Sequence, residues 1–214
     1  MFIQDGLRFH PMKILAYDTS ADFLSIGIFE DDRRIDEENS AAFTRHSASL
    51  VARVEKLFKK NRMKPEDVDC LAVGLGPGSF TGLRVGVTVA KTLAYALNKK
   101  IVGVSSFEAI AREAPDFKGP ITVISDAKKG NVYMALYRRD EKGLKTLLAP
   151  SLRARDQLRV DPKTRVMDAC EHTPRASRIA EIGIQMAKAK KFTDPFGLKP
   201  TYLYGRDCNV TQKI

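Results

Sequence analysis

Residues that could do chemistry gather in a glycine-rich stretch, GPGSFTGLRVG, at positions 76–86. Four glycines in eleven residues indicate a backbone that turns tightly or lies against another group. A Walker phosphate loop needs a lysine after its last glycine, but Leu83 and Arg84 follow Gly82 here. The dinucleotide fingerprint also fails, because the glycines are spaced G-x-G-x-x-x-G, one residue too long. Neither standard nucleotide motif is therefore present.

Two aspartates could act beside this loop. Asp18 and Asp126 each end an apolar strand before a short turn, a place where duplicated phosphate-handling folds put metal-linked carboxylates, although capping of the turn is the more common use. The free amides at the start of the helix after the loop could also hold an anion, or Ser79 could simply cap that helix. The candidate for a weak nucleotide or anion site comprises Asp18, Thr19, Gly76, Gly78 and Ser79.

Other catalytic arrangements are poorly supported. The histidines, His10, His46 and His172, are too scattered for a standard metal motif, so we predict no metal site. A G-x-S-x-G nucleophile elbow is also missing, because the serine of the glycine loop stands in the wrong place. The three cysteines, Cys70, Cys170 and Cys208, form no C-x-x-C pair and predict reduced thiols in a cytoplasmic protein.

Two helices must flank the loop. The first, over about 47–61, carries an apolar stripe of Leu50, Val51, Val54, Leu57 and Phe58. The second, over about 82–98, repeats a small residue every four positions: Gly82, Gly86, Ala90 and Ala94. A glycine inside a helix costs up to about 1 kcal/mol relative to alanine, so this face predicts close approach of another backbone. That neighbour could be the sheet beneath or a second helix, and we favour helix packing over phosphate binding.

The strands form a repeated pattern. Strands at 13–18 and 23–29 predict a hairpin, and TVISDAKKGNVYMALY (122–137) aligns with ILAYDTSADFLSIGIF (14–29) without a gap. We interpret the offset of 108 residues as an internal duplication of an α/β half. The remaining expectations are strands at 70–75, 101–104 and 164–169, helices at 106–113 and 174–190, a loop or short strand at 30–40, a short strand and loop at 144–160, and an extended tail from 192.

These elements predict a leader at 1–11, a first half at 12–104 and a reduced second half with a tail at 105–214. No apolar run is long enough to cross a membrane, and the start of the sequence does not read as a signal peptide. The net charge of +10 favours encounter with anions such as RNA. A basic RNA-binding module is therefore an alternative, although aromatic-plus-basic motifs are missing.

Several stretches together resemble the TsaB (YeaZ) family. They are LAYDTSADFLSIGIF, RHSASL, GPGSFTGLRVGVTVAKTLAYAL, SSFEAIA, SDAKKGNVYMALY and, near the end, KPTYLYGRD. Their order and spacing fit from about Met12 to Tyr137, and the glycine block is the most specific of them. The resemblance implies an α/β fold of the duplicated ASKHA type (actin/Hsp70/ribonuclease H-like), with the second half reduced.

The resemblance also implies a role in making threonylcarbamoyladenosine next to the anticodon of tRNA. In that system TsaC makes threonylcarbamoyl-AMP, TsaD transfers the group, TsaE is an ATPase and TsaB is the non-catalytic partner of TsaD. TsaD carries an H-x-x-x-H metal pair, whereas here Leu50 stands four residues after His46. The resemblance therefore implies a pseudoenzyme that contacts tRNA through the complex and binds no cofactor tightly, with ATP or ADP as a candidate ligand at the interface between subunits.

The same resemblance implies that the first two helices contact TsaD and that the chain forms a homodimer when alone. The interface residues implied are Leu50, Val51, Val54, Leu57, Phe58, Gly82, Gly86, Ala90 and Ala94. Proteins of this superfamily have been described as peptidases (M22-like). This sequence does not support that activity, because it has neither a metal-binding motif nor a nucleophile motif. The alternative function is a small ATP-dependent phosphotransferase of the ASKHA type that uses Asp18 and Asp126.

Overall fold

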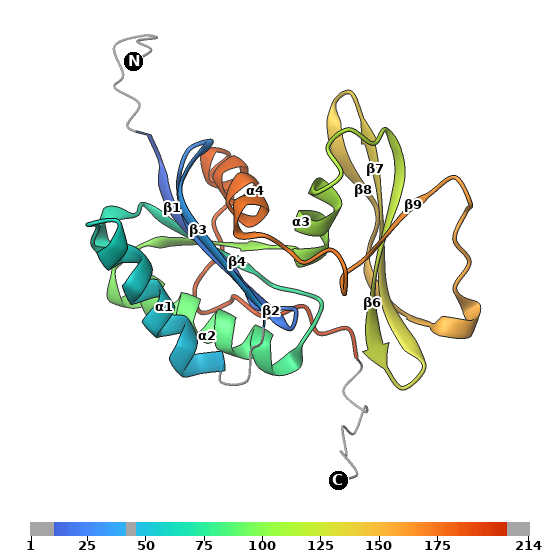
Figure 1. The fold of residues 1–214 in the computed structure, drawn as a ribbon, viewed down its shortest axis with the longest axis horizontal. Coiled ribbons are helices and arrows are strands. Elements are labelled where there is room, and N and C mark those ends of the chain that lie inside the picture. Colours follow the sequence, from blue (N-terminus) through green and yellow to red (C-terminus); the bar gives the residue numbers. More distant parts are fainter. Residues whose placement is uncertain (1–10, 42–45, 205–214) are drawn as a thin grey trace.

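The computed structural model describes residues 11–41 and 46–204, in which two sheets lie side by side (Figure 1). The first has the order β3-β2-β1-β4-β5. Its strands are β1 (Lys13–Asp18), β2 (Phe23–Glu30), β3 (Arg33–Ala41), β4 (Cys70–Gly74) and β5 (Lys100–Val104). The second has the order β8-β7-β6-β9. Its strands are β6 (Gly119–Lys128), β7 (Asn131–Asp140), β8 (Gly143–Ala154) and β9 (Arg165–Asp168).

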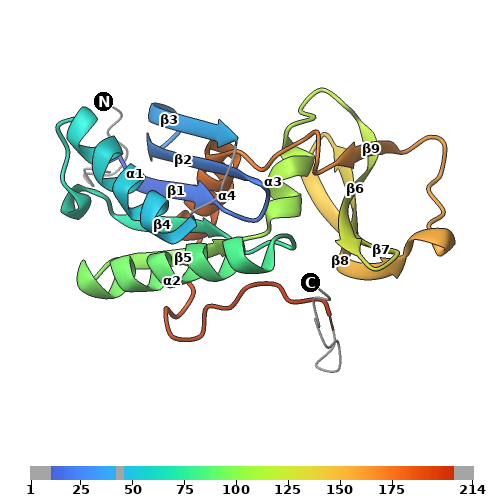
Figure 2. The same cartoon turned by 60° about the horizontal axis from the view of Figure 1, so that its bottom comes forward.

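The helices cover the first sheet more fully than the second. The α-helices are α1 (His46–Lys60), α2 (Phe80–Ala96), α3 (Ser106–Arg112) and α4 (Ala176–Lys188), and short 3₁₀ turns are η1 (Pro65–Asp67) and η2 (Arg155–Gln157). α1 and α2 pack on one face of the first sheet and α4 packs on the other (Figures 1 and 2). α3 packs on β6 and β7 of the second sheet. No helix within the described residues is long and apolar enough to span a membrane.

Burial on both faces explains why the central strands are almost wholly apolar. In β1, Leu15 and Tyr17 point to the core under α1 and α2, whereas Ile14 and Ala16 point to the core under α4. Strands that are buried on both faces carry continuous apolar runs, because neither face meets water. β3, at the edge of the sheet, is instead polar along Asp36, Glu37 and Glu38. Because of this polarity the sequence predicts only a loop or a short strand at residues 30–40. β8, at an edge of the second sheet, runs over Gly143–Ala154 and is longer than the short strand that the sequence predicts there.

The two sheets confirm the duplication but correct its alignment. β3-β2-β1-β4 and β8-β7-β6-β9 have the same order, with two antiparallel pairings and one parallel pairing in each. Ile14 pairs with Phe29 in the first hairpin, and Ile121 pairs with Tyr137 in the second. Ile14 and Phe29 face α4, and Ile121 and Tyr137 face α3, and each of these helices lies opposite the connection to the parallel strand. When these two faces are matched, β6 lies at an offset of 107 from β1, and β7 lies at an offset of 108 from β2. A slip of one residue turns each side chain to the other face, so the gapless alignment is wrong for β6.

The end of the chain returns to the first sheet. α4 packs on β1, β4 and β5, and beyond it Thr193 pairs with Ile101 while Leu198 enters the core beneath α2. Within the described residues, the stretch from α4 to Leu198 therefore packs on the first sheet, although it follows the second sheet in sequence. β5 ends at Val104. The expected leader lies outside the described residues, except for Pro11.

Candidate functional site

The glycine loop connects β4 to α2 and is held by its own hydrogen bonds. Ser79 is the N-cap of α2, and its hydroxyl accepts a hydrogen bond from the amide of Gly82 at 3.3 Å. The amide of Ser79 donates to the carbonyl oxygen of Ser20 at 2.6 Å. Gly76 has a φ of +88°, which favours glycine, and the Gly76–Pro77 peptide bond is cis. The sequence leaves open whether Ser79 caps this helix or the free amides hold an anion. In the structure Ser79 caps the helix.

The turn between β1 and β2 explains the glycines. A Cβ at Gly78 or Gly82 would meet the backbone carbonyl of Ser20 or Thr19, and a Cβ at Gly86 would meet the Thr19 hydroxyl, all inside contact distance. The Thr19 hydroxyl donates to the carbonyl oxygen of Gly82 at 2.8 Å. The Tyr17 hydroxyl, in turn, donates to the carbonyl oxygen of Gly86 at 2.8 Å. The close neighbour of this face of α2 is therefore the sheet and turn of the same chain, which is one of the two neighbours that the sequence leaves open.

Asp18 is buried at the junction of β1, the glycine loop and α3, with 0% of its surface exposed. One carboxylate oxygen accepts hydrogen bonds from the amide and the hydroxyl of Ser20, at 2.7 and 2.6 Å. The other accepts from the hydroxyl of Ser106 at 2.5 Å, and that hydroxyl accepts from the amide of Gly76 at 2.9 Å. Burial raises the pKa of Asp18, and the three hydrogen bonds oppose that rise.

The five candidate anion-site residues do come together, but their polar groups are bound to Ser20, Gly82 and Ser106 of the same chain. A Cβ at Gly74 would collide with the Asp18 carboxylate, so this carboxylate has no open side toward the loop. The amides of Ser79 and Gly82 already have acceptors within the chain. In this arrangement Asp18 cannot reach a metal ion or phosphate in solution. The junction acts as a structural hub that ties the first strand to the loop and to the first turn of α3.

Asp126 does not join this hub. It lies on the hairpin of β6 and β7 in the second sheet, where it pairs with Lys128 at 2.9 Å and Arg155 at 3.1 Å. Hydrogen bonds from Lys128 hold the pKa of Asp126 below its usual range. When the α3 face of the second sheet is matched with the α4 face of the first, Ser125 and not Asp126 takes the position of Asp18. The two aspartates therefore do not form the symmetric pair that a phosphotransferase would need.

Most of the expected interface residues are used inside the chain. Val51 is 53% exposed, whereas the other eight are buried against the first sheet or the turn between β1 and β2. The buried residues are Leu50, Val54, Leu57, Phe58, Gly82, Gly86, Ala90 and Ala94. The periodicity of the two helices was read correctly as one apolar face each, but sequence alone could not say which surface covers it. A contact through α1 and α2 thus depends on their outer residues.

Sequence reasoning missed the partners of Asp18. Ser20 and Ser106 carry its hydrogen bonds, and Tyr17 fixes α2 from within an otherwise apolar strand. The only available signal was the pair Ser105–Ser106 at the start of a helix, since serine is favoured at such positions. Ser105 is the N-cap of α3, and its hydroxyl accepts from the amide of Glu108 at 3.3 Å. That signal predicts a helix cap, but it cannot predict the hydrogen bond from Ser106 to Asp18, which is 88 residues away along the chain.

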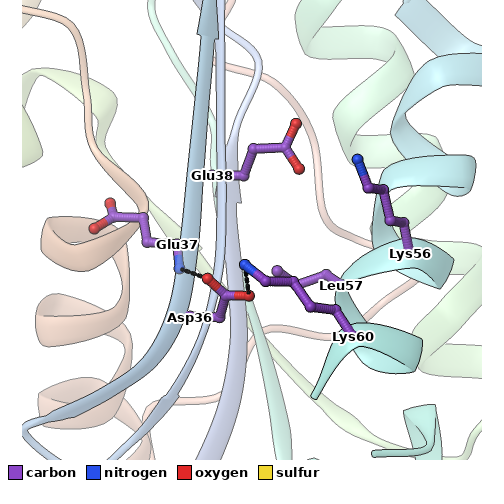
Figure 3. Close-up of a pocket in the computed structure, with 6 residues that line it drawn as sticks. All are labelled: Asp36, Glu37, Glu38, Lys56, Leu57 and Lys60. Atoms are coloured by element: carbon purple, nitrogen blue, oxygen red, sulfur yellow. Dashed lines mark hydrogen bonds and ion pairs between the residues drawn. The ribbon is translucent and has the colours of Figure 1, made fainter. Parts of the chain in front are cut away.

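A hollow of about 310 Å³ lies between β3 and α1 (Figure 3). It is lined by Asp36, Glu37, Glu38, Lys56, Leu57 and Lys60. The ammonium group of Lys60 lies 2.8 Å from a carboxylate oxygen of Asp36, and the guanidinium of Arg53 pairs with Glu38. The side chain of Glu37 turns the other way and accepts from the amide of Ser177 at 3.0 Å. The charges here are engaged with one another, so the hollow gives no chemical indication of a ligand.

Comparison with known proteins agrees with this geometry. A family model described as TsaD, tRNA N6-adenosine threonylcarbamoyltransferase, matches residues 40–214. The tRNA threonylcarbamoyladenosine biosynthesis protein TsaB of Bacillus subtilis is 34% identical over 90% of this chain and 94% of its own. TsaB of Escherichia coli is 33% identical over 62% of this chain and 58% of its own. The structure of YeaZ from Pseudomonas aeruginosa shares the fold, with a TM-score of 0.79 at 20% identity over 90% of this chain and all of that one. The chain therefore belongs to the TsaB family, within the wider family that the TsaD model describes.

Proposed function

We propose that this protein is the non-catalytic TsaB subunit of a cytoplasmic complex that makes threonylcarbamoyladenosine next to the anticodon of tRNA. The observation that carries the proposal is the 34% identity to a TsaB protein over nearly the full length of both chains. The non-catalytic role is supported by the burial of Asp18, whose carboxylate accepts hydrogen bonds from Ser20 and Ser106. The protein would hold TsaD in a competent conformation and contact tRNA through the complex.

The outer side of α1 and α2 is our candidate surface for TsaD. Val51, Thr88, Thr92 and Tyr95 are exposed there, and Val89 is half-buried. These residues are uncharged, which suits a close helix contact better than it suits a solvated face, which would carry more charge. We expect the same surface to join two copies of this chain when TsaD is absent. TsaE would join the complex once TsaD and this subunit have assembled.

Reconstitution tests the function. TsaD, TsaC and TsaE with ATP, threonine, bicarbonate and unmodified tRNA should form the modified nucleoside only when this chain is added. Nucleoside analysis of the digested tRNA by mass spectrometry measures the yield. Equal yield without this chain would contradict the proposal.

Co-purification tests the surface. Val51→Glu combined with Thr88→Glu places two charges on the outer side of α1 and α2 and should abolish recovery of TsaD with the tagged chain. Leu147→Glu is the matched control, because Leu147 is 54% exposed on the second sheet. Val54→Glu would not be informative, since Val54 is buried and a charge there would unfold the chain. Undiminished recovery of TsaD with the double variant would contradict the assigned surface.

Nucleotide binding distinguishes this proposal from the alternative. Because Asp18 and the amides of Gly76, Ser79 and Gly82 have partners within the chain, we place any ATP or ADP at the interface with TsaD. Calorimetry of the isolated chain with ATP and Mg²⁺ should show no binding at micromolar concentrations. Micromolar binding to the isolated chain would favour the phosphotransferase instead.

A further inference from the structure

The second sheet leaves one face without a covering helix. Side chains of Ile121, Val123 and Tyr137 point to the face that α3 covers. This face corresponds to the α4 side of the first sheet, because α3 lies opposite the connection that leads to β9, just as α4 lies opposite α1, which leads to β4. The opposite face of the second sheet therefore corresponds to the side of the first that α1 and α2 cover. Of the described α-helices, only α3 packs closely on the second sheet.

The chain order shows why the cover is missing. In the first half α1 lies between β3 and β4, and α2 follows β4. In the second half the connection from β8 to β9 contains only the short turn η2, and the helix after β9 is α4, which packs on the first sheet. In Figure 1, α3 lies on one side of β6 and β7, and the connection carrying η2 lies on the other. The second sheet therefore has a face equivalent to the one that α1 and α2 cover in the first sheet, but no described helix covers it.

The uncovered face has an apolar centre. Cross-strand neighbours Val166, Thr122, Leu136 and Leu148 form one row across it, and Ile124 and Met134 lie beside them. Val166 is 45% exposed, and Leu136, Leu148, Ile124 and Met134 are partly exposed, whereas Thr122 between them is 1% exposed. A hollow of about 270 Å³ opens over this centre, lined by Met134, Leu148, Arg153, Gln157, Leu158 and Arg159. Partly exposed apolar side chains around a hollow are typical of a binding surface.

The rim of this face is basic. Arg138, Arg153 and Arg159 are exposed, and none of them pairs with a carboxylate among the described residues. Arg159 instead donates to the carbonyl oxygens of Asp156 and Leu158, at 2.9 and 3.2 Å, beside the hollow. Residues 119–170 contain eleven basic and six acidic side chains, so the whole region attracts anions.

We infer that this face binds an amphipathic helix of a partner protein whose apolar stripe is flanked by glutamates or aspartates. The apolar stripe would cover Met134, Leu148 and Val166, as α1 and α2 cover the equivalent face of the first sheet. The acidic flanks would pair with Arg153 and Arg159. RNA fits less well, because the hollow is floored by aliphatic and methionine side chains and not by aromatic rings on which bases stack. The surface lies on the second sheet, away from the α1 and α2 surface proposed for TsaD.

A designed peptide tests this inference. The probe is a fluorescein-labelled helical peptide with leucines at positions i, i+3, i+4 and i+7 and glutamates on both flanks, titrated with the full chain and followed by anisotropy. We expect saturable binding, weakened about tenfold by Arg153→Glu with Arg159→Glu. Arg62→Glu is the control, since Arg62 is exposed on the first half. Circular dichroism melting confirms that each variant is folded.

A second probe makes the result decisive. The same peptide with lysines in place of the glutamates should bind at least about tenfold more weakly, because its flanks repel the arginines. Equal binding of both peptides, or no effect of the two arginine substitutions, would overturn the inference. So would a failure of the glutamate peptide to bind while a single-stranded RNA binds and is released by the same substitutions.

Discussion

At the scale of single residues, Asp18 shows how a position that resembles a catalytic one is used for structure. Its carboxylate accepts hydrogen bonds from Ser20 and Ser106, which belong to the adjacent turn and to α3. A buried carboxylate without a cation is costly unless donors surround it, so these donors are required for folding. Removing the carboxylate would leave both serines without their acceptor in a buried place.

The titration of Asp18 gives a prediction with a definite sign. Burial raises its pKa in the folded chain above the ordinary value of 3.8. Between those two pKa values the folded state binds more protons, so the free energy of unfolding falls as pH rises through this window. Asp18→Asn removes this titration. The destabilisation caused by Asn should therefore grow as the pH falls toward 3.8, measured by urea unfolding at several pH values between about 4 and 7.

Asp126→Asn is the control for that measurement, because the pKa of Asp126 is lowered by Lys128. A lowered pKa stabilises the folded state above the ordinary value, and that stability is lost as the pH falls. The effect of Asp126→Asn should therefore not grow between about pH 7 and 4, opposite to that of Asp18→Asn, and it should shrink as the pH falls below 3.8. The same direction for both variants would show that hydrogen bonds, not burial, dominate the pKa of Asp18.

The glycines of α2 give a second prediction at this scale. Gly86→Ala should cost about 1–3 kcal/mol, because the new methyl group meets the hydroxyl of Thr19. In a Thr19→Ala background that hydroxyl is gone, so the same substitution should cost nothing or add up to about 1 kcal/mol of helix propensity. Gly82→Ala meets a backbone carbonyl and should stay costly in both backgrounds. Urea unfolding of the paired variants measures the coupling, and an unchanged cost of Gly86→Ala would contradict this contact.

At the scale of elements, sequence periodicity placed the helices and central strands well but not their neighbours. The stripe through Leu50 and Val54 predicted the buried face of α1, because a period of 3.6 residues leaves one apolar side. The same pattern cannot tell a sheet of the same chain from a partner, so the interface was assigned to the covered side. A polar edge strand such as β3 is predicted only as a loop or a short strand, because its sequence has no apolar run. The hub around Asp18 depends on contacts far apart in sequence, which periodicity does not report.

The tail beyond α4 was expected to be extended, and the structure gives it a packing role. Leu198 is 1% exposed in the core beneath α2, and its amide donates to the carbonyl oxygen of Asp194 at 2.9 Å. Phe196 is 78% exposed and contacts the ring of Tyr95. Leu198 is therefore buried in the core, whereas Phe196, two positions earlier, lies at the surface.

Leu198→Ala should therefore lower the free energy of unfolding by about 2–4 kcal/mol, because it opens a cavity in the core. Phe196→Ala, the matched control on the same tail, should change it by less than about 0.5 kcal/mol. Urea unfolding followed by circular dichroism measures both. Similar small effects for the two would show that the tail adds little to the stability of the first half.

At the scale of the whole molecule, α4 joins the two halves. It follows the second sheet in sequence, yet its apolar face covers β1, β4 and β5 of the first. The guanidinium of Arg112 on α3 lies 2.5 Å from Glu181 on α4 and 2.9 Å from Glu108. The halves are therefore linked by a buried helix face and by ion pairs between α3 and α4. Such an arrangement favours one cooperative unit over two independent ones.

The thiol of Cys70 can test that cooperativity. Cys70 lies on β4 beneath α4, it is 1% exposed, and burial raises the pKa of its thiol to about 12. In a Cys170→Ser, Cys208→Ser background Cys70 is the only thiol, and it should react with a disulfide reagent only when α4 leaves the sheet. Because that departure exposes the apolar core of the first sheet, we expect the free energy of opening from labelling rates to equal the free energy of global unfolding from urea. An opening free energy well below the urea value would show that α4 detaches by itself, as a separate unit of lower stability.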